Sequence, residues 1–434
     1  MEIVIQPTEK IEGQARPPGD KSISHRALIF SSLAKSTVEI EGLLKSDDIL
    51  STLRCLQGLG VTVEGEGELL KVRGKGLDGL DEPDNILNTG NSGTTARLLA
   101  GLLSGQQFHT VLTGDNSLRK RPMGRIIEPL RKMGALIDGR QNGSLLPLAI
   151  RGSELLPLNY TLPVASAQVK SALLIAALFA RGTTQIVDCY QTRDHTERAL
   201  RHLGVDIKNY GKYTICLRNP AGLRGERWQI PGDISAAAFF MVAAAIAPQG
   251  ELYLREVGIN PTRTGIIDLL KEMGAHISIH NVKGYNGEPI ADLLIKGGRA
   301  LRGIHINKET IPRIVDEVPI LAVAGLFARG ETVIRGAGEL RLKESDRLKS
   351  ITLELKKMGA KIAEFPDGLI IQGGAKLSGA SLLSHGDHRI AMSLAIAALF
   401  AQNESVIKGA ETVRISFPGF FNLLGKLTGQ SSLS

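Results

Sequence analysis

The strongest constraint on the fold is a residue pattern that recurs six times along the chain. Each copy has a polar turn, a helix-like run rich in Ala and Leu, a turn containing glycine, and a β-branched stretch typical of a strand. The copies follow one another at intervals of roughly 70 residues, as expected when one supersecondary unit is repeated. They lie at 22–40, 91–112, 166–187, 233–254, 316–334 and 387–407. This repetition predicts an α/β protein built from six βαβαββ-like units.

A second helical pattern follows each of the first five copies and ends in a glycine. In the clearest example, an apolar stripe on one helical face is followed directly by Gly359. The stripe consists of Leu348, Ile351, Leu355 and Met358. Glycine readily adopts the left-handed conformation that ends many helices. We therefore interpret these stripes as core-facing helix surfaces and not as parts of a site.

The six copies divide into three before and three after a midpoint, which predicts two similar lobes. Prolines at 17–18 and at 231 mark two places where the chain would cross between them. We place the first lobe at 20–231 and a second, discontinuous lobe at 1–19 plus 232–434. The active site would then lie in the cleft between the lobes.

Composition limits the classes of partner. The chain has 434 residues and a formal net charge of +8, which favours acidic partners. Aromatic residues make up only 4% of it, with one tryptophan, so stacking platforms for single-stranded nucleic acid are poorly supplied. We therefore expect small polyanionic substrates, and neither nucleic acid nor a membrane as a partner.

Several features favour the cytoplasm. The first residues lack a basic stretch followed by an apolar core, so no secretory signal is expected. The longest apolar runs, such as 172–180, are shorter than the roughly 20 residues that span a bilayer, and we expect buried helices there. Cys55, Cys189 and Cys216 are scattered and odd in number, which favours reduced thiols. We expect a monomeric cytoplasmic protein.

Polar motifs at the starts of the first two copies suit anions. Residues 17–26 place Lys21 and Arg26 at the opening of a helix, where backbone N–H groups and cations can bind a phosphate or a carboxylate. The glycine-rich stretch 88–97 would let the backbone approach an anion closely at Gly93. The alternatives are a capped surface helix with solvated charges for the first motif and an ordinary turn for the second.

Two further stretches carry cations. The run 119–125 holds four of them and reads as a solvated face, although the proline after Arg121 would hold that residue more firmly than a loose loop. Residues 166–170 offer a hydroxyl, an amide and an ammonium that could grip a phosphate, with a plain serine N-cap as the alternative. Residues 194–197 have capping-box spacing, and we interpret them as structural.

The last two copies add acids. Asp316 and Glu317 lie among apolar residues at a helix entry, where a carboxylate with a shifted pKa can transfer protons. Residues 342–347 place a lysine, two acids and an arginine nearby, and the alternative for both stretches is helix caps with ion pairs. Residues 385–389 hold two histidines and an aspartate, but their spacing is not that of common zinc motifs, so we expect no metal.

Taken together and in order, these motifs resemble the 5-enolpyruvylshikimate-3-phosphate (EPSP) synthase family over essentially the whole chain. They are 18–26 (PGDKSISHR), 90–94 (GNSGT), 120–123 (KRPM), 166–168 (SAQ), 343–347 (KESDR) and 387–389 (DHR). The resemblance implies two lobes of three βαβαββ units joined by two hinge strands, an inside-out α/β barrel. It also implies transfer of the enolpyruvyl group of phosphoenolpyruvate to the 5-hydroxyl of shikimate 3-phosphate. Phosphate is released through a tetrahedral ketal in the shikimate pathway, without metal or organic cofactor, and glyphosate is a known inhibitor of sensitive members.

The resemblance also implies roles for individual residues. The contacts to phosphoenolpyruvate would be Lys21, Gly93, Arg121, Gln168, Arg347 and Arg389. The contacts to shikimate 3-phosphate would be Lys21, Ser22, Arg26, Ser166, Gln168, Asp316 and Lys343. Proton transfers would fall to Asp316, Glu344 and Lys21. The chain departs from some members at Ala167, where they have a serine, and before Phe417, where they have a lysine and Arg414 is the nearest cation here.

Two alternative functions remain at this point. The related enzyme that enolpyruvylates UDP-N-acetylglucosamine would share the architecture, but many of its members carry a reactive cysteine in the loop that corresponds to 114–125, and this loop has none. A nucleic-acid protein related to RNA 3′-terminal phosphate cyclase would suit the basic charge and would show salt-dependent RNA binding.

Overall fold

The structure is a computed structural model that describes residues 1–65, 67–210, 214–218 and 222–430. Its contacts divide the chain into two compact units. The N-terminal unit is Gly19–Ile230 with Gly284–Glu288, and the C-terminal unit is Met1–Pro18, Pro231–Lys283 and Pro289–Ser434. The predicted lobes differ from these units at Gly19 and Pro231, each of which lies in the other unit, and at 284–288, which the sequence analysis places in the second lobe. The predicted cleft between the lobes stays a prediction.

In the N-terminal unit, three four-stranded sheets share one strand order: β14-β3-β5-β4, β6-β7-β9-β8 and β10-β11-β13-β12. In each, the first pair is parallel and the next two pairs are antiparallel. The strands are β3 (Thr37–Glu41), β4 (Thr62–Glu64), β5 (Leu69–Arg73), β6 (Leu87–Asn88), β7 (His109–Thr113), β8 (Leu136–Gly139), β9 (Leu145–Arg151), β10 (Asn159–Thr161), β11 (Thr183–Val187), β12 (Ile207–Tyr210), β13 (Thr214–Arg218) and β14 (Trp228–Gln229). The helices are α1 (Lys21–Ser32), α2 (Asp47–Gly58), α3 (Gly93–Leu103), η1 (Leu118–Lys120), α4 (Gly124–Lys132), α5 (Arg140–Gly143), α6 (Ala167–Ala177) and α7 (His195–His202). The predicted repetition is therefore confirmed in this unit.

In the C-terminal unit, β18-β19-β21-β20 and β2-β15-β17-β16 repeat that order, whereas β1-β23-β22 is a three-stranded sheet. The strands are β1 (Glu2–Ile5), β2 (Lys10–Ala15), β15 (Gln249–Gly258), β16 (His276–Tyr285), β17 (Glu288–Lys296), β18 (His305–Ile306), β19 (Glu331–Ile334), β20 (Ile362–Phe365), β21 (Gly368–Gln372), β22 (Ser381–Leu383) and β23 (Ser405–Lys408). The helices are α8 (Ile234–Ile246), α9 (Gly265–Glu272), η2 (Ile311–Arg313), α10 (Val318–Phe327), η3 (Gly338–Leu342), α11 (Arg347–Lys357), α12 (His388–Leu399), η4 (Ala410–Ile415) and α13 (Phe420–Thr428).

Strands that are distant in sequence complete one sheet in the N-terminal unit and two in the C-terminal unit, where β1 also pairs with β23 in the antiparallel sense. β14 pairs in parallel with β3, with Trp228 opposite Ile40. β2 pairs in parallel with β15, with Lys10 opposite Gln249. Backbone hydrogen bonds thus join segments that are far apart in the chain, and no local pattern in the sequence indicates this pairing.

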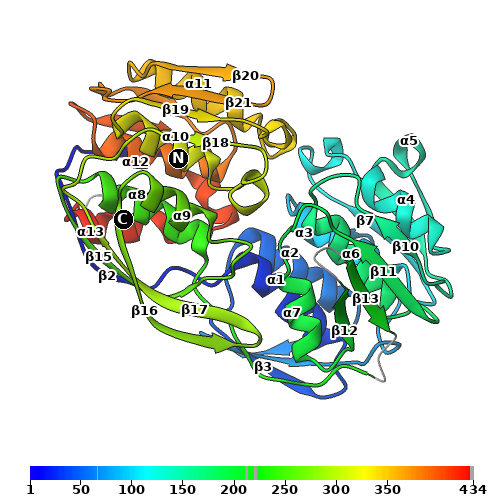
Figure 1. Cartoon of the computed structure of the whole chain (residues 1–434). Helices are drawn as coiled ribbons and strands as arrows, with labels where there is room; N and C mark the ends of the chain where they lie inside the picture. The colour runs from blue at the N-terminus through cyan, green and yellow to red at the C-terminus, as the bar shows by residue number, and fades with distance from the viewer. Residues whose placement is uncertain (66, 211–213, 219–221, 431–434) are drawn as a thin grey trace. The chain divides into compact units, whose positions relative to one another are not determined.

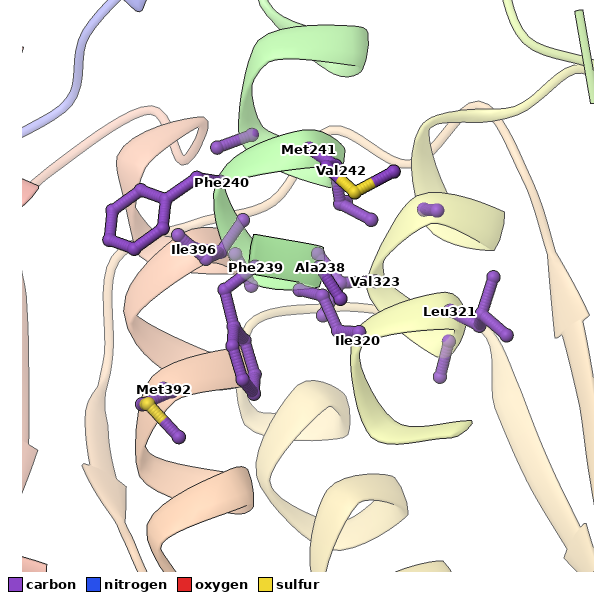
Figure 2. Close-up of a cluster of buried hydrophobic side chains, with 14 of the residues drawn as sticks. Ala238, Phe239, Phe240, Met241, Val242, Ile320, Leu321, Val323, Met392 and Ile396 are labelled. Atoms are coloured by element: carbon purple, nitrogen blue, oxygen red, sulfur yellow. The ribbon is translucent and has the colours of Figure 1, made fainter. Parts of the chain in front are cut away.

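The core of the C-terminal unit lies between helices that are apolar all round. In Figure 1, α8, α10 and α12 lie together inside this unit, and each contacts the other two. Figure 2 shows their side chains converging, among them Phe239 of α8, Val323 of α10 and Ile396 of α12, all buried. A helix that is apolar on every face is stable only when it is surrounded by other elements. In the N-terminal unit, Ala172–Ala177 of α6 are all apolar and buried, so the prediction of a buried helix at 172–180 is confirmed for these residues.

The predicted helix ends are confirmed as well. Every residue of the stripe on α11 is fully buried. The glycines after the second helices all have positive φ: Gly60, Gly134, Gly204, Gly274 and Gly359. No helix in the described part of the chain is long and apolar enough to cross a membrane. Cys55 is buried and Cys189 exposed, both as free thiols, whereas the side chain of Cys216 lies outside the described residues.

Candidate active site

In the N-terminal unit, the helices α1, α3 and α6 each begin with a side-chain cap. Asp20 Oδ1 accepts from the backbone N–H of Ile23 at 2.9 Å, and Ser92 Oγ accepts from that of Thr95 at 3.2 Å. Ser166 Oγ accepts from Val169 N at 3.4 Å, which confirms the predicted N-cap. A cap satisfies only one of the N–H groups in the first turn, so a capped helix start can still bind an anion.

The two cations of the first motif are held by the protein and are not solvated. Lys21 Nζ lies 3.1 Å from Asp48 Oδ2 in the first turn of α2. Arg26 is 5% exposed, and its Nη1 donates to the backbone oxygen of Ser22 at 2.8 Å. Burial lowers the pKa of Arg26 to about 10, although nearby carboxylates, Glu197 first, partly oppose this shift. The alternative of a surface helix with solvated charges is therefore wrong.

Buried side-chain hydrogen bonds join these helix starts. His25 Nδ1 lies 2.7 Å from Thr52 Oγ1 on α2, which lies 2.7 Å from Thr95 Oγ1 on α3. Arg26 Nη2 donates to Ser171 Oγ on α6 at 2.7 Å. Burial lowers the pKa of His25 well below its usual value, and the neighbouring cations lower it further. The starts of α1, α2 and α3 and the first turns of α6 thus belong to one polar cluster, the N-terminal cluster, at one end of the helices.

Gln168 is oriented by a residue that sequence reasoning missed. Arg97 Nη1 donates to Gln168 Oε1 at 3.1 Å, and Gln168 Nε2 donates to Thr94 Oγ1 at 3.1 Å. A Cβ placed on Gly93 would collide with Arg97 Nη1, so this glycine leaves the room that the guanidinium occupies. The available signal was the spacing of Arg97, which lies one helical turn after Gly93 on α3.

Arg121 is also fixed in place. It is 8% exposed, and its Nη2 donates to Asn91 Oδ1 at 2.6 Å and to Ser117 Oγ at 3.2 Å. The backbone oxygen of Pro122 accepts from Arg97 Nη2 at 3.1 Å. The cationic run is therefore not a solvated face at Arg121, and the second motif and this run share a hydrogen-bond network.

The predicted capping box at 194–197 is wrong. The Asp194 side chain makes no capping bond and instead accepts from Arg198 Nε at 2.8 and 2.9 Å. Glu197 Oε1 lies 2.7 Å from Lys170 Nζ, which also contacts Asp188 at 2.9 Å. Lys170, Asp188 and Glu197 are all buried, so the ammonium of Lys170 is held by carboxylates inside the unit. The buried ammonium competes successfully for the carboxylate that a capping box would use.

In the C-terminal unit, Arg347 is the centre of a second group, the C-terminal cluster. It is 1% exposed, and three carboxylates bind it: Asp316 through Nη1 at 3.2 Å, Glu344 through Nη2 at 2.6 Å, and Asp387 through Nε at 2.8 Å. Burial lowers the pKa of Arg347, but the three carboxylates, Asp387 first, outweigh it and hold the pKa above its usual value. The prediction of ion pairs for this stretch is confirmed.

Helix starts supply the rest of this cluster. Arg389, in the first turn of α12, contacts Asp316 through its Nη2 at 3.6 Å from Oδ2. Asp387 caps α12 by accepting from Arg389 N at 2.9 Å. Lys343 and Glu344 lie in the short connection between η3 and α11. Asp316, Glu344, Arg347 and Arg389 are therefore joined in one cluster, and Lys343 is the residue next to Glu344 in the sequence.

The other polar residues of this region have structural partners. Glu317 is fully buried and accepts a hydrogen bond from Ser235 Oγ, which in turn accepts from Arg263 Nη2 at 2.7 Å. His385 contacts Glu354. Across the described ranges, no group of three or more His, Cys, Asp or Glu residues has the arrangement of a metal site. Arg414 lies exposed on η4.

Every predicted site residue thus falls in one of two clusters. The N-terminal unit contributes Lys21, Ser22, Arg26, Gly93, Arg121, Ser166 and Gln168, and the C-terminal unit contributes Asp316, Lys343, Glu344, Arg347 and Arg389. Sequence reasoning missed Asp48 and Arg97, which orient predicted contacts from neighbouring helices. That both clusters serve one reaction stays a prediction.

Comparisons with known proteins identify the family. The family profile described as EPSP synthase (3-phosphoshikimate 1-carboxyvinyltransferase) matches residues 5–424. A relative of that name from Pelotomaculum thermopropionicum is 49% identical over 98% of this chain and 99% of its own, and one from Syntrophomonas wolfei is 52% identical over 96% and 97%. A solved structure of EPSP synthase from Acinetobacter baumannii superposes with a TM-score of 0.88 at 45% identity, covering 98% of each chain. These matches favour the first functional interpretation over both alternatives, and the chain belongs to the EPSP synthase family.

Proposed function

We propose that this chain transfers the enolpyruvyl group of phosphoenolpyruvate to the 5-hydroxyl of shikimate 3-phosphate and releases phosphate, as a step of the shikimate pathway. The observation that carries the proposal is the family match over 5–424. A relative at 49% identity is matched over 99% of its own length, which supports the same reaction for this chain. The proposal needs no metal and no organic cofactor.

Shikimate 3-phosphate is bound by hydroxyls and cations at helix starts. Lys21, Ser22 and Arg26 lie on α1, and Ser166 and Gln168 lie at α6. Arg26 has five N–H donors, and the contacts described above use them only in part, so it can act on the phosphate by charge while it holds Ser22 in place. Asp316 and Lys343 of the C-terminal cluster complete the proposed contacts.

Phosphoenolpyruvate is bound by Lys21, Gly93, Arg121, Gln168, Arg347 and Arg389. The two substrates together carry up to about six negative charges, so the site needs many cations to hold them close. Arg97 orients Gln168, and Asn91 and Ser117 orient Arg121, so these contacts are formed before the ligand binds. Preformed contacts reduce the entropy lost on binding.

The reaction requires proton transfers at the 5-hydroxyl of shikimate 3-phosphate and at the methylene carbon of phosphoenolpyruvate. The 5-hydroxyl loses its proton as its oxygen bonds to the central carbon of the enol, while the methylene carbon gains a proton to become a methyl group. The ketal then loses a methyl proton as its C–O bond to phosphate breaks, which restores the double bond. Asp316 and Glu344 are the proposed proton carriers, with Lys21 as the third. Binding to Arg347 at 3.2 and 2.6 Å fixes the direction of both carboxylates.

The test is phosphate release from phosphoenolpyruvate with purified protein. Release that depends on shikimate 3-phosphate, together with mass-spectrometric detection of the enolpyruvyl ether, is expected. Release that instead depends on UDP-N-acetylglucosamine would establish the related transferase. Salt-dependent RNA retardation in a gel, without either activity, would establish the nucleic-acid alternative.

We further propose that the protein acts as a monomer in the cytoplasm. The scattered cysteines, which favour reduced thiols, support this location. Sedimentation equilibrium at micromolar concentration should give the mass of one chain, and a mass of two chains would overturn the assignment.

A further inference from the structure

Helix α11 contacts the turn that precedes α12 at two separate places. At its first residue, Arg347 Nε donates to Asp387 Oδ2 at 2.8 Å. Two helical turns later, Glu354 Oε1 accepts from His385 Nε2 at 2.8 Å, and Glu354 Oε2 accepts from the backbone N–H of Leu383 at 2.9 Å. The seven-residue separation corresponds to about 10 Å along a helix. The segment 383–387 is therefore held at both ends by one rigid element.

The second contact is made by the carboxylate of Glu354, whose burial is unfavourable unless it is paired. Glu354 is fully buried, and besides its two contacts to the turn it binds Lys357 Nζ at 2.7 and 2.8 Å. Burial raises its pKa, but the hydrogen bonds from Lys357, Leu383 N–H and His385 outweigh burial and hold the pKa below its usual value. The group is thus an ionised acceptor at neutral pH, and the proposed reaction does not use it.

The backbone of this turn requires outside support. His385 has φ +54° and Gly386 has φ +72°, so two consecutive residues are in the left-handed region. A residue with a Cβ persists there only where its surroundings determine its position. The imidazole contact to Glu354 and the N–H of Leu383 supply that support on the side of α11.

The turn leads directly into the C-terminal cluster. Asp387 accepts from Ser345 Oγ at 3.2 Å as well as from Arg347, and it caps the helix that carries Arg389. A displacement of 384–387 would therefore move the carboxylate that orients Arg347 and the helix start that orients Arg389.

We propose that Glu354 and His385 are positioning residues that fix the turn 384–387, and through Asp387 the guanidinium groups of Arg347 and Arg389, and so set the affinity for phosphoenolpyruvate. This inference rests on the proposed function, in which those two arginines contact that substrate. Neither Glu354 nor His385 touches substrate. They act on the binding of one substrate by holding the groups that do.

The decisive variants are two substitutions of the same histidine. His385→Gln places an amide N–H near the position of Nε2 and can keep the contact to Glu354, whereas His385→Asn is too short to reach it. Asparagine tolerates the left-handed conformation well, so His385→Asn removes the contact without adding backbone strain. Lys357→Gln is the matched control, because Lys357 binds the same carboxylate from within α11 and makes no tie to the turn.

Steady-state kinetics of the full chain should separate these variants. We expect His385→Asn to raise the KM for phosphoenolpyruvate about tenfold or more, since small displacements of positioning groups have large kinetic effects. Its kcat should fall as well, because Arg347 orients Asp316 and Glu344. Its KM for shikimate 3-phosphate should change less than about twofold, because most of the proposed contacts to that substrate belong to the N-terminal unit. His385→Gln and Lys357→Gln should stay close to the wild type, and Glu354→Gln, where it folds, should behave like His385→Asn.

Several results would overturn the inference. Equal impairment of His385→Asn and His385→Gln would show that the Glu354 contact is not what matters. A lower melting temperature without a change in the KM for phosphoenolpyruvate would show a purely structural role. Arg389→Lys distinguishes the two levels of proposal. If Arg389→Lys raises the KM for phosphoenolpyruvate and His385→Asn does not, the role of Glu354 and His385 is wrong but the proposed substrate contacts stand. If neither variant raises this KM, the proposed contacts to phosphoenolpyruvate are wrong.

Discussion

Two arginines at helix starts, Arg26 on α1 and Arg347 on α11, are almost equally buried but lie in opposite environments. Arg26 donates hydrogen bonds to the hydroxyls of Thr196 and Ser171 and to one backbone oxygen, and burial lowers its pKa to about 10. Arg347 binds three carboxylates, and its pKa rises. Among the described residues no carboxylate forms an ion pair with Arg26. Its charge is therefore available to an anion, whereas the charge of Arg347 also holds three acids in place.

The N-terminal cluster is accordingly suited to binding, and the C-terminal cluster both to binding and to orienting acids for proton transfer. The same residue type in the same type of motif serves two purposes. The difference depends on which side chains the packing brings to the guanidinium group.

The largest expected effect is on stability. Arg347→Met leaves three buried or partly buried carboxylates without their cation, so it should lower the free energy of unfolding by about 3–5 kcal/mol. Arg26→Met leaves only neutral hydrogen-bond partners unpaired, so it should lower the free energy of unfolding by about 1–3 kcal/mol. The same variant should raise the KM for shikimate 3-phosphate. Urea denaturation of the full chain measures both free energies. Equal losses would remove the contrast between the two environments.

The next effect concerns turnover. Asp316→Asn and Glu344→Gln should each lower kcat about a hundredfold or more, because they remove a proton carrier, with smaller changes in substrate KM. Asp346→Asn is the control from the same connection, since asparagine can also cap α11. Phosphate release under saturating substrates is the assay. Near-normal turnover of either acid variant would show that this carboxylate only positions Arg347 and does not transfer protons.

A smaller effect is expected from a single methyl group in the N-terminal cluster. In Gly93→Ala the new Cβ would collide with Arg97 Nη1 and so disturb Gln168. The KM for phosphoenolpyruvate should rise, and glyphosate, the longer ligand, should be excluded more strongly, by about ten- to two-hundredfold. Inhibition series on both proteins at matched phosphoenolpyruvate saturation measure the ratio. Unchanged inhibition constants would place Gly93 away from the ligand.

The smallest effect is a pH dependence that should originate in the N-terminal cluster. His25 has a pKa well below its usual value, so below about pH 6.5 the unfolded chain takes up a proton that the folded chain does not. Stability should therefore fall with decreasing pH, by up to about 1.4 kcal/mol per unit from this group. The lowered pKa of Glu354 in the C-terminal unit also makes stability fall with decreasing pH, but only below about pH 4.5, the usual pKa of this carboxyl group. Denaturation of the wild type and of His25→Gln between these limits should show a shallower slope for the variant, and parallel slopes would assign the loss to other groups.

Local features of this protein could be predicted from the sequence by itself. The six helix starts, the cap at Ser166, the buried stripe on α11 and the left-handed glycines all depend on residues within about one helical turn of each other. Because the period of a helix and the conformational freedom of glycine do not depend on distant contacts, these predictions were confirmed. The family resemblance then assigned roles to residues at those same helix starts.

Only the tertiary structure decided which partner each charge has. Asp48 reaches Lys21 from another helix, and Glu197 binds Lys170 where a capping box was predicted. Glu354 and His385 are 31 residues apart in sequence and meet across α11 and the turn before α12. A buried charge must find an opposite charge or hydrogen-bond partners wherever the packing places them, because leaving it unpaired costs several kcal/mol. The spacing of residues along the chain does not indicate which partner a buried charge has, so the partners could be identified only from the folded structure.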